Sequence, residues 1–337
     1  FLETGLTDVA ADEAGNAVGR LSGRRGNRTI LLVSHLEGIF LPNHDREVIV
    51  KADRVICPGV GDNALGAAVV SMIPVLLEHL GIDLDSDLIL VGSIGSLDRG
   101  NHKGIRSFLD QFPDDIDYGI CVEGMQLGRM NFFSIGTARA DITCDVRAEQ
   151  PSRSYGSESA LVVLNHIINR ILGIAVPVRP YTVVRMGKLR AGVAYDVEPD
   201  HATLGLEIVS HDDEEIDRIH REMEAIISEM SARHAVEAKL DVFFRARACG
   251  IPFAHPLVTS VLNVMGELGI ESDQGHSPSE LSELITRDIP AVTLGLTYGE
   301  KNRKRKPDYV LIEPILLGVA QLLGTILAID EGTCDDV

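Results

Sequence analysis

Apolar strand-like runs alternate with helical patterns over residues 30–125, and this alternation constrains the fold more than any other feature of the sequence. The runs at 29–37, 87–92 and 118–124 are almost continuously apolar, which is typical of parallel strands buried on both faces. Between the first two runs, apolar residues recur at every third or fourth position over residues 65–80, which predicts a helix. The pattern therefore predicts an α/β domain.

This pattern changes from about residue 138 and returns at Pro256. The intervening segments follow the order β-α-β-β-α-β, an arrangement that forms a compact four-stranded sheet with two helices. We therefore expect a three-layer α/β/α domain formed by residues 1–136 and 248–337. An inserted α+β (ferredoxin-like) domain is expected at residues 137–247.

Composition excludes several classes of partner. The net charge is −19 over 337 residues, so a nucleic-acid backbone would be repelled, and no Trp is available for stacking on bases. The most apolar stretch, 315–329, is too short to span a bilayer. The five cysteines form no CxxC pair and are odd in number, which favours reduced thiols and a cytoplasmic location.

Three polar side chains stand at the ends of expected strands or in the turn before the expected helix: His35, Asp62 and Glu123. An imidazole and two carboxylates can together hold a divalent metal ion such as zinc. Each residue also has a simpler interpretation. Asp62 could cap the following helix, His35 could be a hydrogen-bonded core residue, and Glu123 could be a solvated residue at a strand end.

These residues and their order resemble the dinuclear-zinc peptidase and aminoacylase family (metallopeptidase family twenty), which includes acetylornithine deacetylase, succinyl-diaminopimelate desuccinylase, peptidase T and glutamate carboxypeptidase. The resemblance covers nearly the whole chain. It implies a zinc-peptidase-like α/β domain with an inserted lid domain, through which members of the family often form homodimers. It rests on the segments 15–16, 35–37, 61–63, 100–104, 290–295 and 308–309, and on Glu123.

The resemblance implies that His35, Asp62 and Glu123 hold one zinc ion. The family usually has an Asp two residues after the His, which orients its ring; Glu37 stands there in this chain and could do the same. The other zinc of the family needs a Glu-Glu pair, whose first member is the general base, and a late His. The corresponding positions are Ser96, Leu97 and about Lys304.

Neither Ser96 nor Leu97 can act as a general base at neutral pH. A lysine near the vacated position is expected to neutralise the second oxygen of Asp62. Other groups near the expected sheet ends are weaker candidates for a displaced base, and two further family positions differ. The displaced-base candidates are Asp98, His102 and His276, and the differing positions are Val209, where the family has an Arg, and residues 147–154, which lack the family's His.

Two functional hypotheses follow. In the first, the chain has lost or strongly impaired hydrolysis and keeps at most a one-metal half-site and a cleft for a small amino-acid-like or peptide ligand. In the second, one ion bound by His35, Asp62 and Glu123 still activates water, and the chain hydrolyses the amide bond of a peptide or N-acyl amino acid. The sequence leaves open whether one zinc, another divalent ion or no ion is bound.

Overall fold

The computed structural model describes residues 1–38, 47–112, 116–146, 159–234, 236–277, 279–301 and 308–335. The chain divides into two compact units. Unit 1 consists of Phe1–Ser134 and Cys249–Val337, and unit 2 consists of Ile135–Ala248. The boundaries expected from the sequence, at 136/137 and 247/248, fall beside these.

Unit 1 is built on a seven-stranded sheet whose central strands are parallel. Antiparallel strands extend this sheet at both edges. In spatial order the strands are β1 (Thr7–Ala11), β2 (Ala17–Leu21), β6 (Asp87–Ser93), β3 (Thr29–His35), β7 (Tyr118–Met125), β15 (Ala291–Thr297) and β8 (Met130–Asn131).

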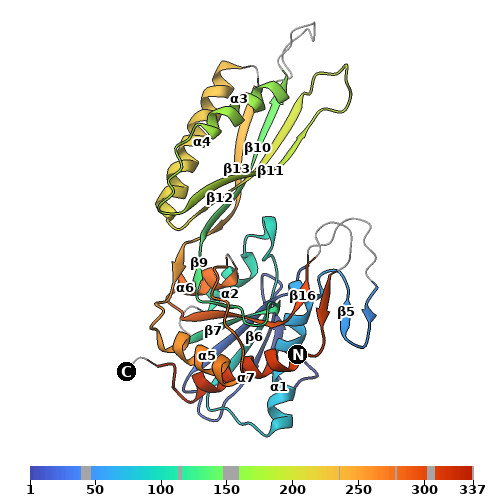
Figure 1. Cartoon of the computed structure of the whole chain (residues 1–337), viewed down its shortest axis with the longest axis vertical. Coiled ribbons are helices and arrows are strands. Elements are labelled where there is room, and N and C mark those ends of the chain that lie inside the picture. Colours follow the sequence, from blue (N-terminus) through green and yellow to red (C-terminus); the bar gives the residue numbers. More distant parts are fainter. Residues whose placement is uncertain are drawn as a thin grey trace. The chain divides into compact units, whose positions relative to one another are not determined.

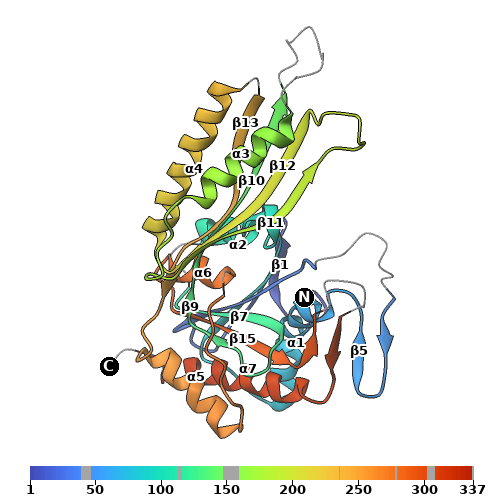
Figure 2. The same ribbon diagram turned by 45° about the horizontal axis from the view of Figure 1, so that its top comes forward.

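Helices cover both faces of this sheet, as Figures 1 and 2 show. One face packs against α1 (Leu65–Leu80), α5 (Pro256–Glu267) and α7 (Ile315–Asp330). The other face packs against α2 (Lys103–Gln111) and α6 (Glu280–Ile285). The predicted α/β class and its three layers are confirmed.

The first helix after the Asp62 turn is a core helix, as its periodicity predicts. Its residues Val69, Ile73 and Leu77 are buried, and the helix ends at Gly81, whose φ of 66° suits a residue without a side chain. The segment Val60–Leu80 is long and apolar enough to cross a membrane, but half of it is buried within the protein. Its apolar character is therefore explained by packing against the sheet.

Parallel strands bring their carboxyl ends together at one edge of the sheet. His35 at the end of β3 pairs in register with Ser93 at the end of β6. Glu123 near the end of β7 pairs with Gly295 of β15. A small antiparallel sheet of unit 1 contains β4 (Ile49–Val50), β5 (Arg54–Ile56), β17 (Tyr309–Leu311) and β16 (Gly299–Glu300), and β9 (Phe133–Ser134) pairs with β14 (Cys249–Gly250).

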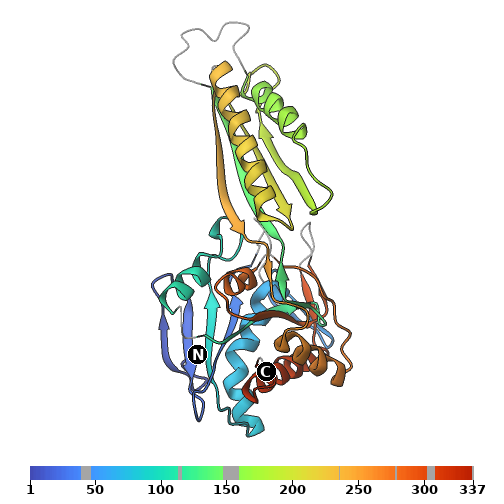
Figure 3. The same ribbon diagram turned by 90° about the vertical axis from the view of Figure 1, so that its left-hand side faces the viewer.

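Unit 2 has the predicted order β-α-β-β-α-β. Its antiparallel sheet has the strand order β11-β12-β10-β13, and Figure 3 shows both helices on the same face of it. Apolar residues of the sheet and of both helices form a separate core. The elements are β10 (Gly136–Val146), α3 (Ala160–Leu172), β11 (Thr182–Ala191), β12 (His201–Ser210), α4 (Asp213–Arg233) and β13 (Val236–Ala246).

Candidate metal centre

The structure brings His35, Asp62 and Glu123 together at the carboxyl ends of the parallel strands. One ligand atom of each residue lies within 4.8 Å of the others. An imidazole nitrogen and two carboxylate oxygens suit zinc and similar divalent ions, and three protein donors leave room for further ligands. The two converging carboxylates repel each other unless a cation lies between them. The donor set therefore fits a divalent ion.

The ring of His35 is held in one orientation. Its Nδ1 lies 2.9 Å from the backbone carbonyl oxygen of Glu37, so Nδ1–H donates to that oxygen. Nε2 is then the nitrogen with a free lone pair, and it lies 3.3 Å from Oδ1 of Asp62. A hydrogen bond of this kind selects the tautomer that metal-binding histidines use. His35 is thus a hydrogen-bonded buried residue that also presents a donor atom to the site.

Asp62 lies in a tight turn, Val60–Ala64, immediately before α1. The cap position of α1 is Ala64, and no side chain caps it, so the simpler interpretation of Asp62 as a helix cap is wrong. A residue distant in the sequence holds the start of the turn, because Oδ2 of Asp308 accepts a hydrogen bond of 2.9 Å from the backbone N–H of Gly59. The carboxylate of Asp62 is free to point toward His35.

The neighbouring residue, Asn63, anchors the turn to two strands. Its Nδ2 donates to Oγ of Ser34 at 2.8 Å and to the carbonyl of Val122 at 2.7 Å. Its Oδ1 accepts from the backbone N–H of Gly124 at 2.7 Å. Asn63 is only 1% exposed, so this amide is satisfied entirely by protein groups. These bonds join the residues next to His35, Asp62 and Glu123 into one rigid arrangement.

Glu123 is a buried group, and the interpretation as a solvated strand-end residue does not hold. Its side chain is 14% exposed, and Nη1 of Arg129 lies 3.9 Å from its carboxylate. Burial raises the pKa of Glu123, the charges of His35 and Arg129 oppose that rise, and the nearby carboxylate of Glu280 adds to it. A positive ion in the site would favour the charged form of Glu123.

The sequence suggests that the side chain of Glu37 could orient the ring of His35, but in the structure it does not. Its backbone carbonyl does so, while its carboxylate reaches the altered turn at residues 95–97. The carboxylate accepts hydrogen bonds from the backbone N–H groups of Gly95, Ser96 (2.7 Å) and Leu97 (3.1 Å). The extra methylene of Glu relative to Asp explains the difference, because it carries the carboxylate past the imidazole to the next strand end.

Glu37→Gln is expected to lower the free energy of unfolding by about 2–4 kcal/mol, because hydrogen bonds to a charged group contribute roughly 1.5–3 kcal/mol each and an amide has only one acceptor oxygen. Urea unfolding followed by circular dichroism measures the change. Glu3→Gln, at an exposed position, is the matched control. A loss below about 0.5 kcal/mol would show that the three N–H groups do not depend on this carboxylate.

Two of the positions that the resemblance aligns with the family's second zinc site are Ser96 and about Lys304. Ser96 is 4% exposed, and its Oγ lies 3.1 Å from Oγ of Ser93. Lys304 lies outside the described residues. The lysine that neutralises the second oxygen of Asp62 is Lys301, whose Nζ donates to Oδ2. Each oxygen of Asp62 therefore has its own partner, His35 on one side and an ammonium group on the other.

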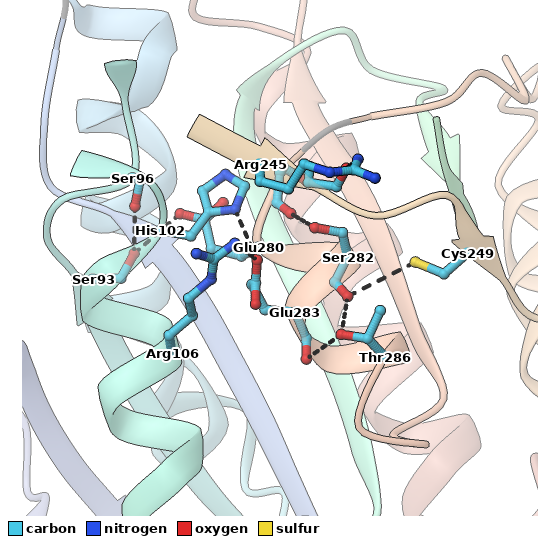
Figure 4. A network of polar contacts seen from close by, with 12 residues as sticks. Ser93, Ser96, His102, Arg106, Arg245, Cys249, Glu280, Ser282, Glu283 and Thr286 are labelled. Carbon is cyan, nitrogen blue, oxygen red and sulfur yellow. Dashed lines mark hydrogen bonds and ion pairs between the residues drawn. The ribbon is translucent and has the colours of Figure 1, made fainter. Parts of the chain in front are cut away.

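Sequence reasoning missed two buried acids on α6, drawn in Figure 4. Oε1 of Glu280 accepts a hydrogen bond of 3.2 Å from Ser93. Glu283 lies 3.3 Å from Nδ1 of His102 and 2.7 Å from Nη2 of Arg106. Burial raises the pKa of Glu283, but the hydrogen bonds from His102 and Arg106 and the charge of Arg106 outweigh it and lower the pKa to about 2. The available signal was the sequence Glu-Leu-Ser-Glu-Leu at 280–284, in which both the acids and the leucines are three residues apart.

The weaker candidates for a displaced base do not join the three residues. Asp98 is exposed, and His276 is exposed with its ring 6.4 Å from that of Phe133. His102 is 2% exposed and faces Glu283. Val209 is buried in β12 of unit 2, and residues 147–154 lie outside the described part of the chain.

Known structures share this fold over nearly the full length of the chain. The sequence itself matches no protein-family model and no curated protein. A tripeptidase from Staphylococcus aureus is 19% identical, with 98% of this chain and 90% of that chain covered and a TM-score of 0.75. The dipeptidase Dug1p from Saccharomyces cerevisiae is 8% identical, with coverage of 98% and 88% and a TM-score of 0.78.

A third similar structure is YxeP from Bacillus subtilis, described as a dinuclear metal-binding peptidase of the M20 family. It is 13% identical, with coverage of 98% and 89% and a TM-score of 0.66. At these identities the comparison establishes the fold alone, so the chemistry must be inferred from the residues of this chain. The chain therefore has the fold of the M20 metallopeptidases, the family that its sequence resembles.

Proposed function

We propose that this chain binds a single divalent metal ion, most simply zinc, through His35, Asp62 and Glu123, and that its hydrolysis of amide bonds is lost or strongly impaired. The observation that carries the proposal is the composition and hydrogen bonding of the turn at residues 95–97. Its side chains include no acid, and its backbone N–H groups are bonded to the carboxylate of Glu37. A second ion at Asp62 would also be repelled by the ammonium group of Lys301, which donates to Oδ2 of this residue.

The chemical consequence follows from what each group can do. A divalent ion polarises a carbonyl group and lowers the pKa of water when it is bound. In this chain His35 would present Nε2 to such an ion, and Asp62 and Glu123 would each present an oxygen. The two residues at the position of the family's acid pair, Ser96 and Leu97, cannot accept a proton at neutral pH. Loss of a positioned base typically costs about 10²–10⁴-fold in rate.

We further propose that the ligand is a small amino-acid-like or peptide molecule, and that the chain forms a homodimer through unit 2. Both parts rest on the resemblance to the family and on the peptidases named among the similar structures. Light scattering tests the second part, and a particle of twice the 36.5 kDa of one chain is the expected result. A monomer at micromolar concentration would contradict it.

The main test combines metal content with turnover. Protein purified without chelator should contain one ion per chain, and chelated protein titrated with zinc in a calorimeter should bind one ion. A panel of dipeptides and N-acyl amino acids, supplied with zinc, cobalt or manganese, should show no hydrolysis above a matched Asp62→Asn control. Two ions per chain would contradict the proposed site. Turnover that disappears in the control would establish instead the second hypothesis, a one-metal hydrolase.

A further inference from the structure

Glu280 is a buried carboxylate that reaches the edge of the sheet where the candidate metal centre lies. It is 4% exposed and is the first residue of α6. Its Oε1 accepts a hydrogen bond from Ser93, which in turn contacts Ser96, as Figure 4 shows. Ser93 is paired in register with His35. Glu280 therefore contacts the residue that stands directly beside a candidate ligand.

The protein compensates the charge of Glu280 without a lysine or an arginine: burial raises the pKa of this carboxyl, but the imidazoles of His35 and His102 and the hydrogen bonds it accepts lower it below its usual value. In the described part of the chain no lysine or arginine forms an ion pair with it, and its hydrogen bonds come from the hydroxyls of Ser93 and Ser96 and from its own backbone. Its favourable charge contacts are the imidazoles of His35 and His102, and its unfavourable contact is the carboxylate of Glu123. A buried carboxylate is costly unless it is paired with a cation or faces a metal ion.

Glu283, one turn further along the same helix, provides the contrast. It is also buried, but Arg106 and Arg287 both donate to its carboxylate, at 2.7 Å and 3.3 Å. The protein thus supplies two guanidinium groups to one acid of α6 and none to the other. Among the described residues, Glu280 is thus balanced by imidazoles and hydrogen bonds alone, and a cation bound beside His35 would add to this compensation.

We propose that Glu280 is a third anionic group of the ion site, beside Asp62 and Glu123, which holds a divalent cation by its charge and through hydrogen-bonded water and does not ligate the cation directly. This inference rests on the proposed ion site. Direct ligation is not part of the proposal, because among the described residues the ligand atoms that lie within 4.8 Å of one another belong to His35, Asp62 and Glu123. Glu280 is thus a positioning residue that raises the affinity of the site.

The test compares Glu280→Gln with Glu283→Gln, a matched substitution on the same helix. Loss of a supporting group around a metal site typically costs about 10–100-fold in affinity. We therefore expect zinc affinity, measured by calorimetry on the chelated full chain, to fall by about 10–100-fold in Glu280→Gln and to change less than about threefold in Glu283→Gln. The visible spectrum of bound Co²⁺ should keep its intensity in Glu280→Gln, because the ligands themselves are unchanged.

Each other outcome overturns the inference. Equal losses of zinc affinity in Glu280→Gln and Glu283→Gln would mean that any change in α6 weakens the site. Unchanged zinc affinity in Glu280→Gln would show that the charge of Glu280 does not act on the ion. A changed Co²⁺ spectrum would make Glu280 a direct ligand. If Glu280→Gln does not fold, Ser93→Ala replaces it and should weaken binding about threefold, with unchanged affinity overturning the inference. Failure of the proposed function is distinct, since the wild-type chain would then bind no zinc.

Discussion

The variant Asp62→Asn is expected to bind zinc at least about 100-fold more weakly than the wild-type chain, equivalent to about 2.7 kcal/mol or more of binding free energy. Asp62 contributes a negative charge and an oxygen that faces Nε2 of His35. An amide of the same size keeps the shape of the turn but removes the charge. It also removes the negative charge that faces the ammonium group of Lys301, so this group repels a cation in the site more strongly.

Calorimetric titration of chelated protein measures this loss, and circular dichroism confirms that the fold is kept. Asp98→Asn is the matched control, because Asp98 is an exposed acid in the same unit. It should bind zinc like the wild type. Equal affinity of Asp62→Asn and the wild type would place the ion elsewhere and would remove the basis of the proposed function.

The variant Glu283→Gln is expected to lose about 3 kcal/mol of unfolding free energy at pH 7 and less than half of that at pH 3. The pKa of Glu283 falls from its ordinary value of 4.5 to about 2 in the folded chain. A lowered pKa stabilises the folded state above pH 4.5, and the contribution disappears as the pH falls toward 2. Each unit of pKa corresponds to about 1.36 kcal/mol, which gives the expected magnitude.

Urea unfolding at the two pH values, with chelator present, measures the difference between variant and wild type. Glu267→Gln is the control, since Glu267 is exposed at the end of α5 and should show almost no change at either pH. A loss in Glu283→Gln that is the same at pH 3 and pH 7 would mean that packing, and not the ionised carboxylate, accounts for the destabilisation.

The fold and the three candidate ligands could be predicted because both depend on regular patterns. Continuous apolar runs predicted the parallel strands, and parallel strands place their carboxyl ends at one edge. His35 and Glu123 therefore had to lie near each other once β3 and β7 were recognised as neighbours. The apolar periodicity after Asp62 predicted α1 in the same way.

The finer contacts could not be predicted, because they depend on side-chain reach and on distant partners. The orientation of Asp62 depends on hydrogen bonds of Asn63 and Asp308. Asn63 bonds to residues of β3 and β7, and Asp308, which is distant in the sequence, accepts from the backbone of the turn. The six residues of α6 are too few for a periodicity to stand out, so the sequence does not mark Glu280 as a buried helical residue. Lys301 and Lys304 lie in one basic run, and spacing alone does not identify which of them contacts Asp62.

The reach of Glu37 has a consequence for substitutions at the neighbouring turn. Its carboxylate already occupies the N–H groups of residues 95–97, so new acids at Ser96 and Leu97 would add negative charge beside an existing one. Substitution of those two positions by acids would therefore be disfavoured unless Glu37 is shortened to Asp. Acids at positions 96 and 97 would thus need a shorter residue at position 37 in the same chain, so single substitutions would not place them there without a cost.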